Sequence, residues 1–362
     1  MLTTPTTQDH VPVLKDAFKG KFLIGAVLGY DALQGKDPAS VEIATTHFDA
    51  LTAENSMKPA LVQPKEGEFD FADGDRLLDI TQQCGATAIG HTLLWHQQTP
   101  KWFFEGPDDQ PTNRELALAR MRKHIATLVG RYKGRIKQWD VVNEAISDAE
   151  GEYLRPNSPW FKAVGEDHIA QAFRAAHEAD PDAILIYNDY NIEQEYKRPK
   201  AIRLLRSLLE QDVPLHAVGI QGHWRMDTLN VAEIEEAIKE FAALGLKVMI
   251  TELDISVLPT KYQGADLSTR EELTPEINPY TEGLPENVAR QHAECYRQVF
   301  KMFLCHKDAI GRVTLWGVHD GRSWFNDFPV RGRTDYPLLF DRQGKPKPAF
   351  FAVLKAAQDQ PQ

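Results

Sequence analysis

Eight short apolar segments constrain the fold of this chain more than any other feature of the sequence. They cover residues 22–29, 48–55, 86–94, 136–144, 183–189, 217–223, 247–254 and 313–320. Nearly continuous apolar segments that alternate with helical patterns are typical of parallel strands buried on both faces. Eight such units predict an α/β protein with a single closed (β/α)8 TIM barrel rather than an open sheet.

The segments between these strands carry the periodicity of amphipathic helices. Helices are predicted over residues 73–84, 113–130, 161–179, 198–209, 231–244 and 286–303. The pattern is clearest in 113–130, where the apolar residues Leu118, Met121, Ile125, Leu128 and Val129 share one face. Gly130 supplies a stop signal for that helix, and other glycines and prolines separate the remaining units.

The length and charge of the chain limit its domains and partners. One barrel with insertions fills 362 residues, so we expect a single (β/α)8 domain over 16–357 with short tails at 1–15 and 358–362. A net charge of -11 repels phosphate backbones and argues against nucleic acid as a partner. No apolar run approaches the ~20 residues of a membrane span, so no membrane partner is expected. We expect a monomer.

The first ten residues and the cysteines bear on the compartment. Residues 1–10 are polar and rich in threonine, without the basic and apolar regions of a signal peptide. This start fits a mature secreted or periplasmic protein, and it equally fits a cytoplasmic one. The three cysteines, Cys84, Cys295 and Cys305, form no even-numbered disulfide framework, and we expect reduced, mostly buried thiols.

Polar side chains gather where the predicted strands end. They are Glu54 and Asn55, His91, Asn143 and Glu144, Asn188 and Asp189, Gln221 and His223, Glu252 and Asp254, and Trp316 and His319. In a barrel all of these face one mouth, where barrel active sites lie. The alternative is that strand ends are polar because loops are solvated. Solvation alone favours Lys, Ser and Gly over this mixture of amides, imidazoles, carboxylates and indoles.

Two of these strand ends deliver carboxylates, Glu144 and Glu252, and such a pair suits acid/base or glycosyl chemistry. Other chemistries have no support. The chain lacks a G-x-G-x-x-G motif, a P-loop, a G-x-S-x-G elbow and an H-E-x-x-H motif, so no cofactor is predicted. His91 and His96 are not at a usual zinc spacing, so no metal is expected either. His223, taken alone, fits a hydrogen-bonded core histidine.

Seven stretches of the chain resemble glycoside hydrolase family 10, the β-1,4-xylanases. They are residues 52–59, 91–96, 139–145, 187–191, 219–223, 250–254 and 314–318, in family order. The resemblance implies a retaining endo-1,4-β-xylanase that hydrolyses xylan or xylooligosaccharides without a cofactor. A barrel glycosidase acting on β-glucan or aryl cellobiosides, and a catalytically silent carbohydrate-binding barrel, are the alternatives.

The resemblance also implies residue roles. Glu144 corresponds to the acid/base and Glu252 to the nucleophile, which retaining enzymes hold ~5–5.5 Å apart. Asn143, Gln221, His223 and Asp254 correspond to residues that support catalysis. The substrate-binding positions correspond to Glu54, Asn55, Lys58, His91, Trp95, Asn188, Trp316 and Trp324. For Trp139 and Trp160, plain core packing is the preferred interpretation.

The sequence departs from the common family pattern after the last strand. His319 and Arg322 stand at variable positions, and an extended loop follows at 326–336 with Arg331 and Arg333. A loop of this length at the barrel mouth is more often functional than idle. The arginines either pair locally and pin the loop, or bond a sugar hydroxyl or a glucuronate branch.

Overall fold

Eight parallel strands form a closed barrel in the computed structural model, which describes residues 11–107, 110–260 and 270–359. The strands are β1 (Leu23–Leu28), β2 (Ala50–Ala53), β3 (Thr87–Trp95), β4 (Ile136–Asn143), β5 (Ile184–Asp189), β6 (Ala217–Ile220), β8 (Lys247–Ser256) and β9 (Ile310–Leu315). Each pairs in parallel with the next, and the β6–β8 and β9–β1 pairings close the ring. The predicted (β/α)8 TIM barrel is confirmed.

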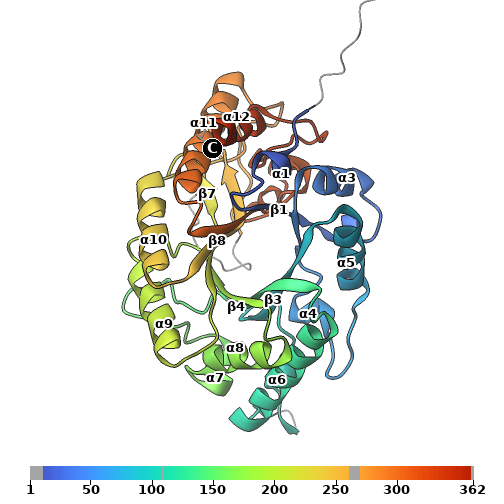
Figure 1. Cartoon of the computed structure of the whole chain (residues 1–362), viewed down its shortest axis with the longest axis vertical. Helices are drawn as coiled ribbons and strands as arrows, with labels where there is room; N and C mark the ends of the chain where they lie inside the picture. The colour runs from blue at the N-terminus through green and yellow to red at the C-terminus, as the bar shows by residue number, and fades with distance from the viewer. Residues whose placement is uncertain (1–10, 108–109, 261–269, 360–362) are drawn as a thin grey trace, which may run out of the picture.

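Helices surround the barrel as an outer ring (Figure 1). They are α1 (Leu14–Ala17), α2 (Tyr30–Leu33), α3 (Pro38–His47), α4 (Pro59–Val62), α5 (Ala72–Cys84), α6 (Arg114–Arg131), α7 (Pro159–Val164), α8 (His168–Ala179), α9 (Arg198–Glu210), α10 (Val231–Ala243), α11 (Glu286–Cys305) and α12 (Pro348–Gln358). Short 3-10 turns occur at η1 (Lys101–Phe104), η3 (Asp320–Arg322) and η4 (Trp324–Asn326). None of the described helices is long and apolar enough to cross a membrane.

Polar residues at the helix ends fix where several helices begin and stop. The side chains of Asn113 and Asn230 accept hydrogen bonds from backbone N–H groups in the first turns of α6 and α10. These caps satisfy donors that the helix itself leaves unpaired. Gly85 ends α5 with φ 70°, a left-handed conformation that glycine adopts without a Cβ penalty. The predicted boundaries of these three helices are therefore within one residue of the observed ones.

Three predicted elements were wrong in part: the helix over 161–179, the last strand and the strand over 217–223. The single helix expected over 161–179 is broken into α7 and α8 by Gly165, which has φ 95°. The last strand was expected over 313–320, but β9 begins and ends earlier. Gly317, at φ 140°, turns the chain out of the sheet. Asp320 then lies buried beside the Lys347 ammonium in a 3-10 turn instead of in a strand.

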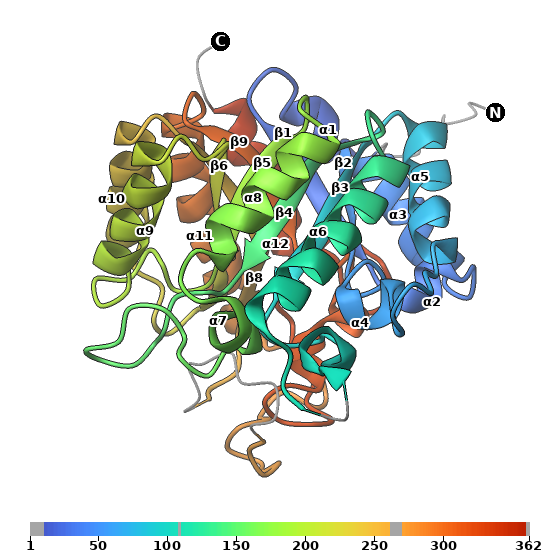
Figure 2. The same ribbon diagram turned by 90° about the horizontal axis from the view of Figure 1, so that it is seen from below.

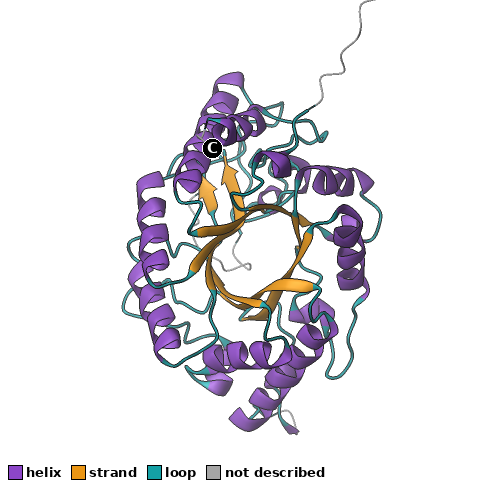
Figure 3. Ribbon diagram, viewed as in Figure 1, coloured by secondary structure: helices purple, strands orange, loops and turns teal. Residues whose placement is uncertain are grey.

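A short additional strand, β7 (His223–Arg225), pairs with β8 beside the closed ring (Figure 3). The sequence pattern had placed His223 at the end of a single strand over 217–223. The chain instead leaves β6 at Ile220, turns at Gly222 and pairs again, which sets His223 opposite Asp254.

The main hydrophobic core fills the space between the strands and the helices, and it includes the buried indoles of Trp139 and Trp160, as predicted. A small separate apolar cluster of Ile186, Ala217 and Met249 lies inside the ring. The thiols were predicted to be mostly buried, and this was wrong: Cys84 and Cys295 are half-buried, and Cys305 is exposed on α11. Residues 1–10 and 360–362 of the expected tails lie outside the described residues.

Gly90 on β3 gives a test of how tightly a strand packs against the side chains of its neighbour β4. A Cβ at this position would overlap the ring of Trp139, and that indole is completely buried. Overpacking of this kind costs about 1–3 kcal/mol. We therefore expect Gly90→Ala to lower the free energy of unfolding by that amount in urea denaturation.

Gly130→Ala is the matched control, because Gly130 lies in α6 and no described neighbour lies within 4 Å of the Cβ that alanine would add. Alanine is favoured over glycine in a helix, so this variant is expected to keep or raise stability. Equal stabilities of the two variants would contradict the packing argument for Gly90.

Candidate active site

A cleft of about 430 Å³ opens at the carboxyl ends of the strands, where the long connections gather (Figure 2). Ten of the residues predicted for the site line it: Glu54, Asn55, Lys58, Trp95, Glu144, Gln221, His223, Glu252, Trp316 and Trp324. The other four, Asn143, Asn188, His91 and Asp254, are buried and hydrogen-bond to residues of the site or of its support. All fourteen are thus brought to one end of the barrel.

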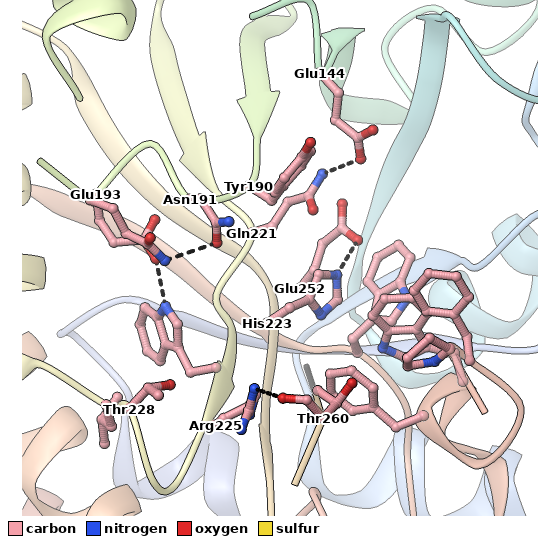
Figure 4. Close-up of a pocket in the computed structure, with 18 of the residues that line it drawn as sticks. Glu144, Tyr190, Asn191, Glu193, Gln221, His223, Arg225, Thr228, Glu252 and Thr260 are labelled. Atoms are coloured by element: carbon pink, nitrogen blue, oxygen red, sulfur yellow. Dashed lines mark hydrogen bonds and ion pairs between the residues drawn. The ribbon is translucent and has the colours of Figure 1, made fainter. Parts of the chain in front are cut away.

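Glu144 and Glu252 reach the cleft from different strands, and both are 4% exposed (Figure 4). Glu252 lies within β8. Glu144 is the first residue after β4, and its φ of 57° lies in the left-handed region. A non-glycine residue in this region stores strain that the surrounding structure must compensate, and such residues concentrate at functional sites.

Three amide side chains connect the two glutamates. Gln221 donates to Oε1 of Glu144 at 2.9 Å and to Oδ1 of Asn143 at 3.3 Å. Asn188 donates to that same Asn143 oxygen at 2.9 Å and to Oε1 of Glu252 at 2.8 Å. Because amides neither gain nor lose a proton in this pH range, this bridge fixes both carboxyl groups without adding charge.

The imidazole of His223 lies between two carboxylates and contacts the oxygen of Glu252 that Asn188 leaves free. His223 lies 3.1 Å from Oε2 of Glu252 through Nε2 and 2.9 Å from Oδ1 of Asp254 through Nδ1. Trp324 donates its indole N–H to the second oxygen of Asp254 at 2.9 Å. Gly222, at φ 82°, makes the turn that aims Gln221 and His223 at different glutamates.

The surroundings shift the pKa values of the two glutamates in opposite directions. Burial is the largest influence on Glu144 and raises its pKa; the hydrogen bonds from Gln221 and Trp95 and the charge of Arg155 offset only part of this rise. Burial also raises the pKa of Glu252. There, the His223 hydrogen bond and the neighbouring charges of His91, His223 and Lys58 outweigh it, so the pKa lies below its usual value.

His223 itself is held as a cation. Burial lowers its pKa, but Asp254 and Glu252 together raise it to about 10. At neutral pH both ring nitrogens are therefore protonated and both donate, one to each carboxylate. A pair of carboxyl groups whose pKa values are driven apart is the arrangement that lets one act as an acid while the other stays ionised.

One side of the cleft is built from residues that follow β2 and from the carboxyl end of β3. Lys58 donates to Oδ1 of Asn55 at 2.9 Å, and its ammonium lies 4.8 Å from the centroid of the Trp95 ring. Trp95 donates its indole N–H to Oε2 of Glu144 at 2.7 Å. The Trp316 ring meets the edges of His91 and His223. These contacts combine flat apolar area with polar groups, as a sugar site requires.

The opposite side contains residues that the sequence analysis did not predict. Tyr190, Asn191, Glu193, Trp224 and Arg225 line the cleft there. Glu193 is 3% exposed and accepts a hydrogen bond from the Trp224 indole at 2.9 Å (Figure 4). These residues could have been identified from the charged and aromatic residues that directly follow the fifth and sixth predicted strands. They were missed because strand β7, which carries Trp224 and Arg225, was not predicted.

Two further residues that were not predicted hold site residues in place from outside the cleft. Asp140 Oδ2 lies 2.9 Å from Nδ1 of His91. Arg155 donates to the backbone oxygen of Glu144 at 2.8 Å and also bonds Asp148 and Tyr190. Both Asp140 and Arg155 look like ordinary polar residues in the sequence, because nothing in the local pattern indicates which side chain they reach.

The loop at 326–336 contributes to the cleft through apolar residues. Phe328 and Pro329 line the cleft, and Phe328 stacks on Trp324. Arg333 is buried and donates to the backbone oxygens of Phe325 and Phe328, so it pins the loop. Of the two interpretations of the loop arginines, the contacts of Arg333 support the one in which an arginine pins the loop.

The comparisons with known proteins agree with this geometry. The family model described as glycosyl hydrolase family 10 matches residues 13–356. The chain belongs to glycosyl hydrolase family 10. The family resemblance predicted from the seven motifs is therefore confirmed.

Two xylanases are among the proteins that this chain matches over almost their full lengths. A β-1,4-xylanase of Dictyoglomus thermophilum is 39% identical, covering 96% of this chain and 91% of the relative. An endo-1,4-β-xylanase of Geobacillus stearothermophilus is 41% identical, covering 95% of this chain and 98% of the relative. The solved structure of an endoxylanase of this family from a sugarcane soil metagenome has a TM-score of 0.91 at 44% identity, covering 94% of this chain and 99% of that one.

The cation at His223 generates a prediction about the carboxyl group beside it. Replacing the imidazolium with an amide in His223→Gln removes the hydrogen bond and the positive charge that lower the pKa of Glu252. We expect that pKa to rise, so that Glu252 protonates at a higher pH than in the wild-type protein. A ¹³C NMR titration of labelled glutamate carboxyl carbons measures the change.

His306→Gln is the matched control, because His306 also lies beside a glutamate, 2.9 Å from Glu235 on the outer helix α10. It is expected to leave the Glu252 titration unchanged. If His223→Gln also leaves it unchanged, then Lys58 and His91 hold Glu252 ionised and the imidazolium does not.

Proposed function

We propose that this protein is a retaining endo-1,4-β-xylanase, which hydrolyses internal β-1,4-xylosidic bonds of xylan and xylooligosaccharides by double displacement. One observation carries the proposal: two buried carboxyl groups face one cleft, with the pKa of Glu144 raised and that of Glu252 lowered. Family membership and the names of the relatives supply the substrate class.

In the first step Glu252 acts as the nucleophile. Its carboxylate attacks the anomeric carbon while Glu144 donates its proton to the leaving glycosidic oxygen, and a covalent glycosyl-enzyme forms. His223 and Asn188 each hold one oxygen of Glu252 and keep the carboxylate ionised and oriented. The raised pKa of Glu144 keeps its proton available at the pH where Glu252 is ionised.

In the second step Glu144 acts as a base. The departure of the leaving group exposes the anomeric carbon to water, and the ionised Glu144 takes a proton from that water as it attacks. Loss of the negative charge on Glu252 in the intermediate removes one contribution that raises the pKa of Glu144. Glu144 is therefore a weaker acid before the first step than after it, and the change favours its second role.

The residues that line the cleft suit an uncharged sugar chain such as xylan. Trp95, Trp316 and Trp324 supply indole surface for the apolar faces of sugar rings. Glu54, Asn55 and Lys58 supply hydrogen bonds for the hydroxyl groups, with His91, Asn143 and Asn188 behind them. Lys58 and Trp316 are nearly buried in the wall of the cleft, and we expect them, with Trp324, to clash with the hydroxymethyl group that distinguishes glucose from xylose.

The proposed mechanism also has consequences for the oligomeric state and for the cellular compartment of the protein. Every group named in the two steps comes from one chain, which supports action as a monomer. Polymeric xylan is too large to enter a cell, so a polymer-degrading enzyme acts in the secreted or periplasmic space. An enzyme restricted to short oligosaccharides could act in the cytoplasm, and fractionation of the native host measures which compartment holds the protein.

The substrate assignment predicts a difference between two polymers. Wild-type protein is expected to release reducing sugar from xylan at least about tenfold faster than from carboxymethylcellulose, because the extra hydroxymethyl groups of glucan clash with the cleft walls. Equal rates would favour a β-glucan hydrolase. Binding of xylan without any release of sugar would favour a silent carbohydrate-binding barrel.

The two glutamates are expected to respond differently to the leaving group. In Glu144→Ala the proton donor is missing, so aryl xylobiosides with acidic phenols should still form the covalent intermediate. Added azide should then restore turnover and give a β-glycosyl azide. In Glu252→Ala the nucleophile is missing, and neither an acidic phenol nor azide should restore turnover with retention. Product NMR measures the azide and its anomeric configuration, and identical responses of the two variants would overturn the assigned roles.

A further inference from the structure

The backbone just after β4 holds Glu144 in a conformation that an L-residue does not favour by itself. Its φ of 57° lies in the left-handed region, which costs a non-glycine residue free energy unless the surrounding structure fixes it. Both backbone polar groups of Glu144 are paired: its N–H donates to the backbone oxygen of Asn188 at 2.9 Å, and its carbonyl accepts from Arg155 at 2.8 Å. The conformation of Glu144 is therefore set by residues outside β4.

The next two residues of the chain are fixed by two side chains of the neighbouring strand β5. Ala145 donates its backbone N–H to the hydroxyl oxygen of Tyr187 at 3.1 Å. Ile146 donates its backbone N–H to Oδ2 of Asp189 at 3.4 Å. The Tyr187 hydroxyl in turn donates to that same carboxyl oxygen at 2.6 Å. Tyr187 and Asp189 thus form one hydrogen-bonded pair, and both of its members accept from the backbone that follows Glu144.

The Tyr187–Asp189 pair is itself held in one arrangement. Both side chains are completely buried, as is Lys197, whose ammonium lies 2.9 Å from Oδ1 of Asp189. Tyr190 donates its backbone N–H to that oxygen as well, at 2.9 Å. Burial and the adjoining carboxyl group raise the pKa of the Tyr187 hydroxyl well above its usual value, so it stays protonated and donates to Asp189. Because each of these buried groups is costly to leave unpaired, the network resists rearrangement.

The pair lies on the face of β5 that points away from the cleft. Successive side chains of a strand point to opposite faces, and Asn188, between the two, is the residue that bonds Asn143 and Glu252 within the site. Tyr187 belongs to the main hydrophobic core instead, and neither Tyr187 nor Asp189 lines the cleft. The pair is therefore out of reach of a substrate, and it can affect the reaction only through the backbone that it holds.

We propose that Tyr187 and Asp189 are positioning residues, which hold the backbone of residues 144–146 so that the Glu144 carboxyl group faces the leaving glycosidic oxygen. This inference rests on the proposed function. Proton donation needs the acid within about 2.6–3.2 Å of the oxygen that it protonates, and a misplacement of about 1 Å can cost about 100-fold in rate. The carboxylate of Glu252 is held by His223 and by the Asn188 side chain, so its attack does not depend on the pair.

The leaving group distinguishes this role from a general loss of structure. In Tyr187→Phe the Ala145 N–H loses its acceptor and Asp189 loses a donor, while the ring stays in the core. We expect kcat/KM for xylotetraose, whose leaving sugar needs a proton, to fall about tenfold or more. For dinitrophenyl xylobioside, whose phenolate leaves without a proton, we expect kcat/KM to stay within about twofold of the wild-type value. Asp189→Asn should show the same difference between the two substrates.

Tyr132→Phe is the matched control, because Tyr132 is also buried and its hydroxyl also donates to an aspartate, Asp75 at 3.1 Å, but the two belong to the outer helices α6 and α5. It should keep the wild-type ratio of kcat/KM for the two substrates. An unchanged ratio in Tyr187→Phe or Asp189→Asn, including an equal fall with both substrates, overturns the role of that residue while the proposed function stands. A wild-type protein that cleaves neither substrate overturns the proposed function, and this inference with it.

A double substitution tests whether Tyr187 acts through Glu144. Once Glu144→Ala has removed the carboxyl group, the position of its backbone no longer affects proton donation. Release of phenol from an aryl xylobioside with a weakly acidic phenol should therefore fall about tenfold or more when Tyr187→Phe is added to the wild-type enzyme. It should change by less than about twofold when Tyr187→Phe is added to Glu144→Ala, since the effects of residues that act as a unit are not additive. Equal further losses in both backgrounds mean that Tyr187 acts elsewhere and overturn the inference.

Discussion

The imidazolium of His223 is the interaction on which the rest of the site depends. Glu252 is 4% exposed, and a carboxylate this deeply buried takes up a proton unless a positive charge compensates it. His223 supplies that charge because Asp254, which holds its other nitrogen, and Glu252 itself together raise the pKa of the imidazole. The short strand β7 sets His223 opposite Asp254 in register, so the backbone pairing and the charge compensation are one structural feature.

Glu144 is surrounded differently from Glu252, because the nearby positive charges do not contact its carboxyl group. Arg155 bonds the backbone oxygen of Glu144, not its side chain, and Lys197 is buried between Asp148 and Asp189. Within the described part of the chain, the donors to the Glu144 carboxyl group are the neutral side chains of Gln221, Trp95 and Asn143. Neutral donors steady a carboxyl group without forcing it to ionise, and so its pKa stays raised.

The sequence was sufficient to predict the barrel and both glutamates, because the signal for each is local. A strand such as 247–256 carries the apolar run 248–250 and then Glu252 and Asp254, and that pattern is visible without any knowledge of its neighbours. The residues that were missed depend on long-range contacts. Asp140 is recognised as a supporting residue only through its bond to His91 on another strand. Arg155 is recognised only through its bond to the backbone oxygen of Glu144, eleven residues earlier. The wrong boundaries at Gly165 and Gly317 have a similar origin, since a glycine in a regular pattern gives no sign of whether packing will use its conformational freedom.

The interior of the barrel explains why strands with an apolar sequence can carry a polar site. On β4, Trp139 belongs to the core between strands and helices, while Gln138 and Asp140 bond Arg312 and His91 inside the ring. Arg312 is 1% exposed and also donates to Thr314, so the ring holds a hydrogen-bonded polar column beneath the two glutamates. Burying such a column costs free energy unless its groups are paired. The outer apolar core offsets that cost, and the stability of the fold thus comes from the face of each strand opposite to the one that forms the site.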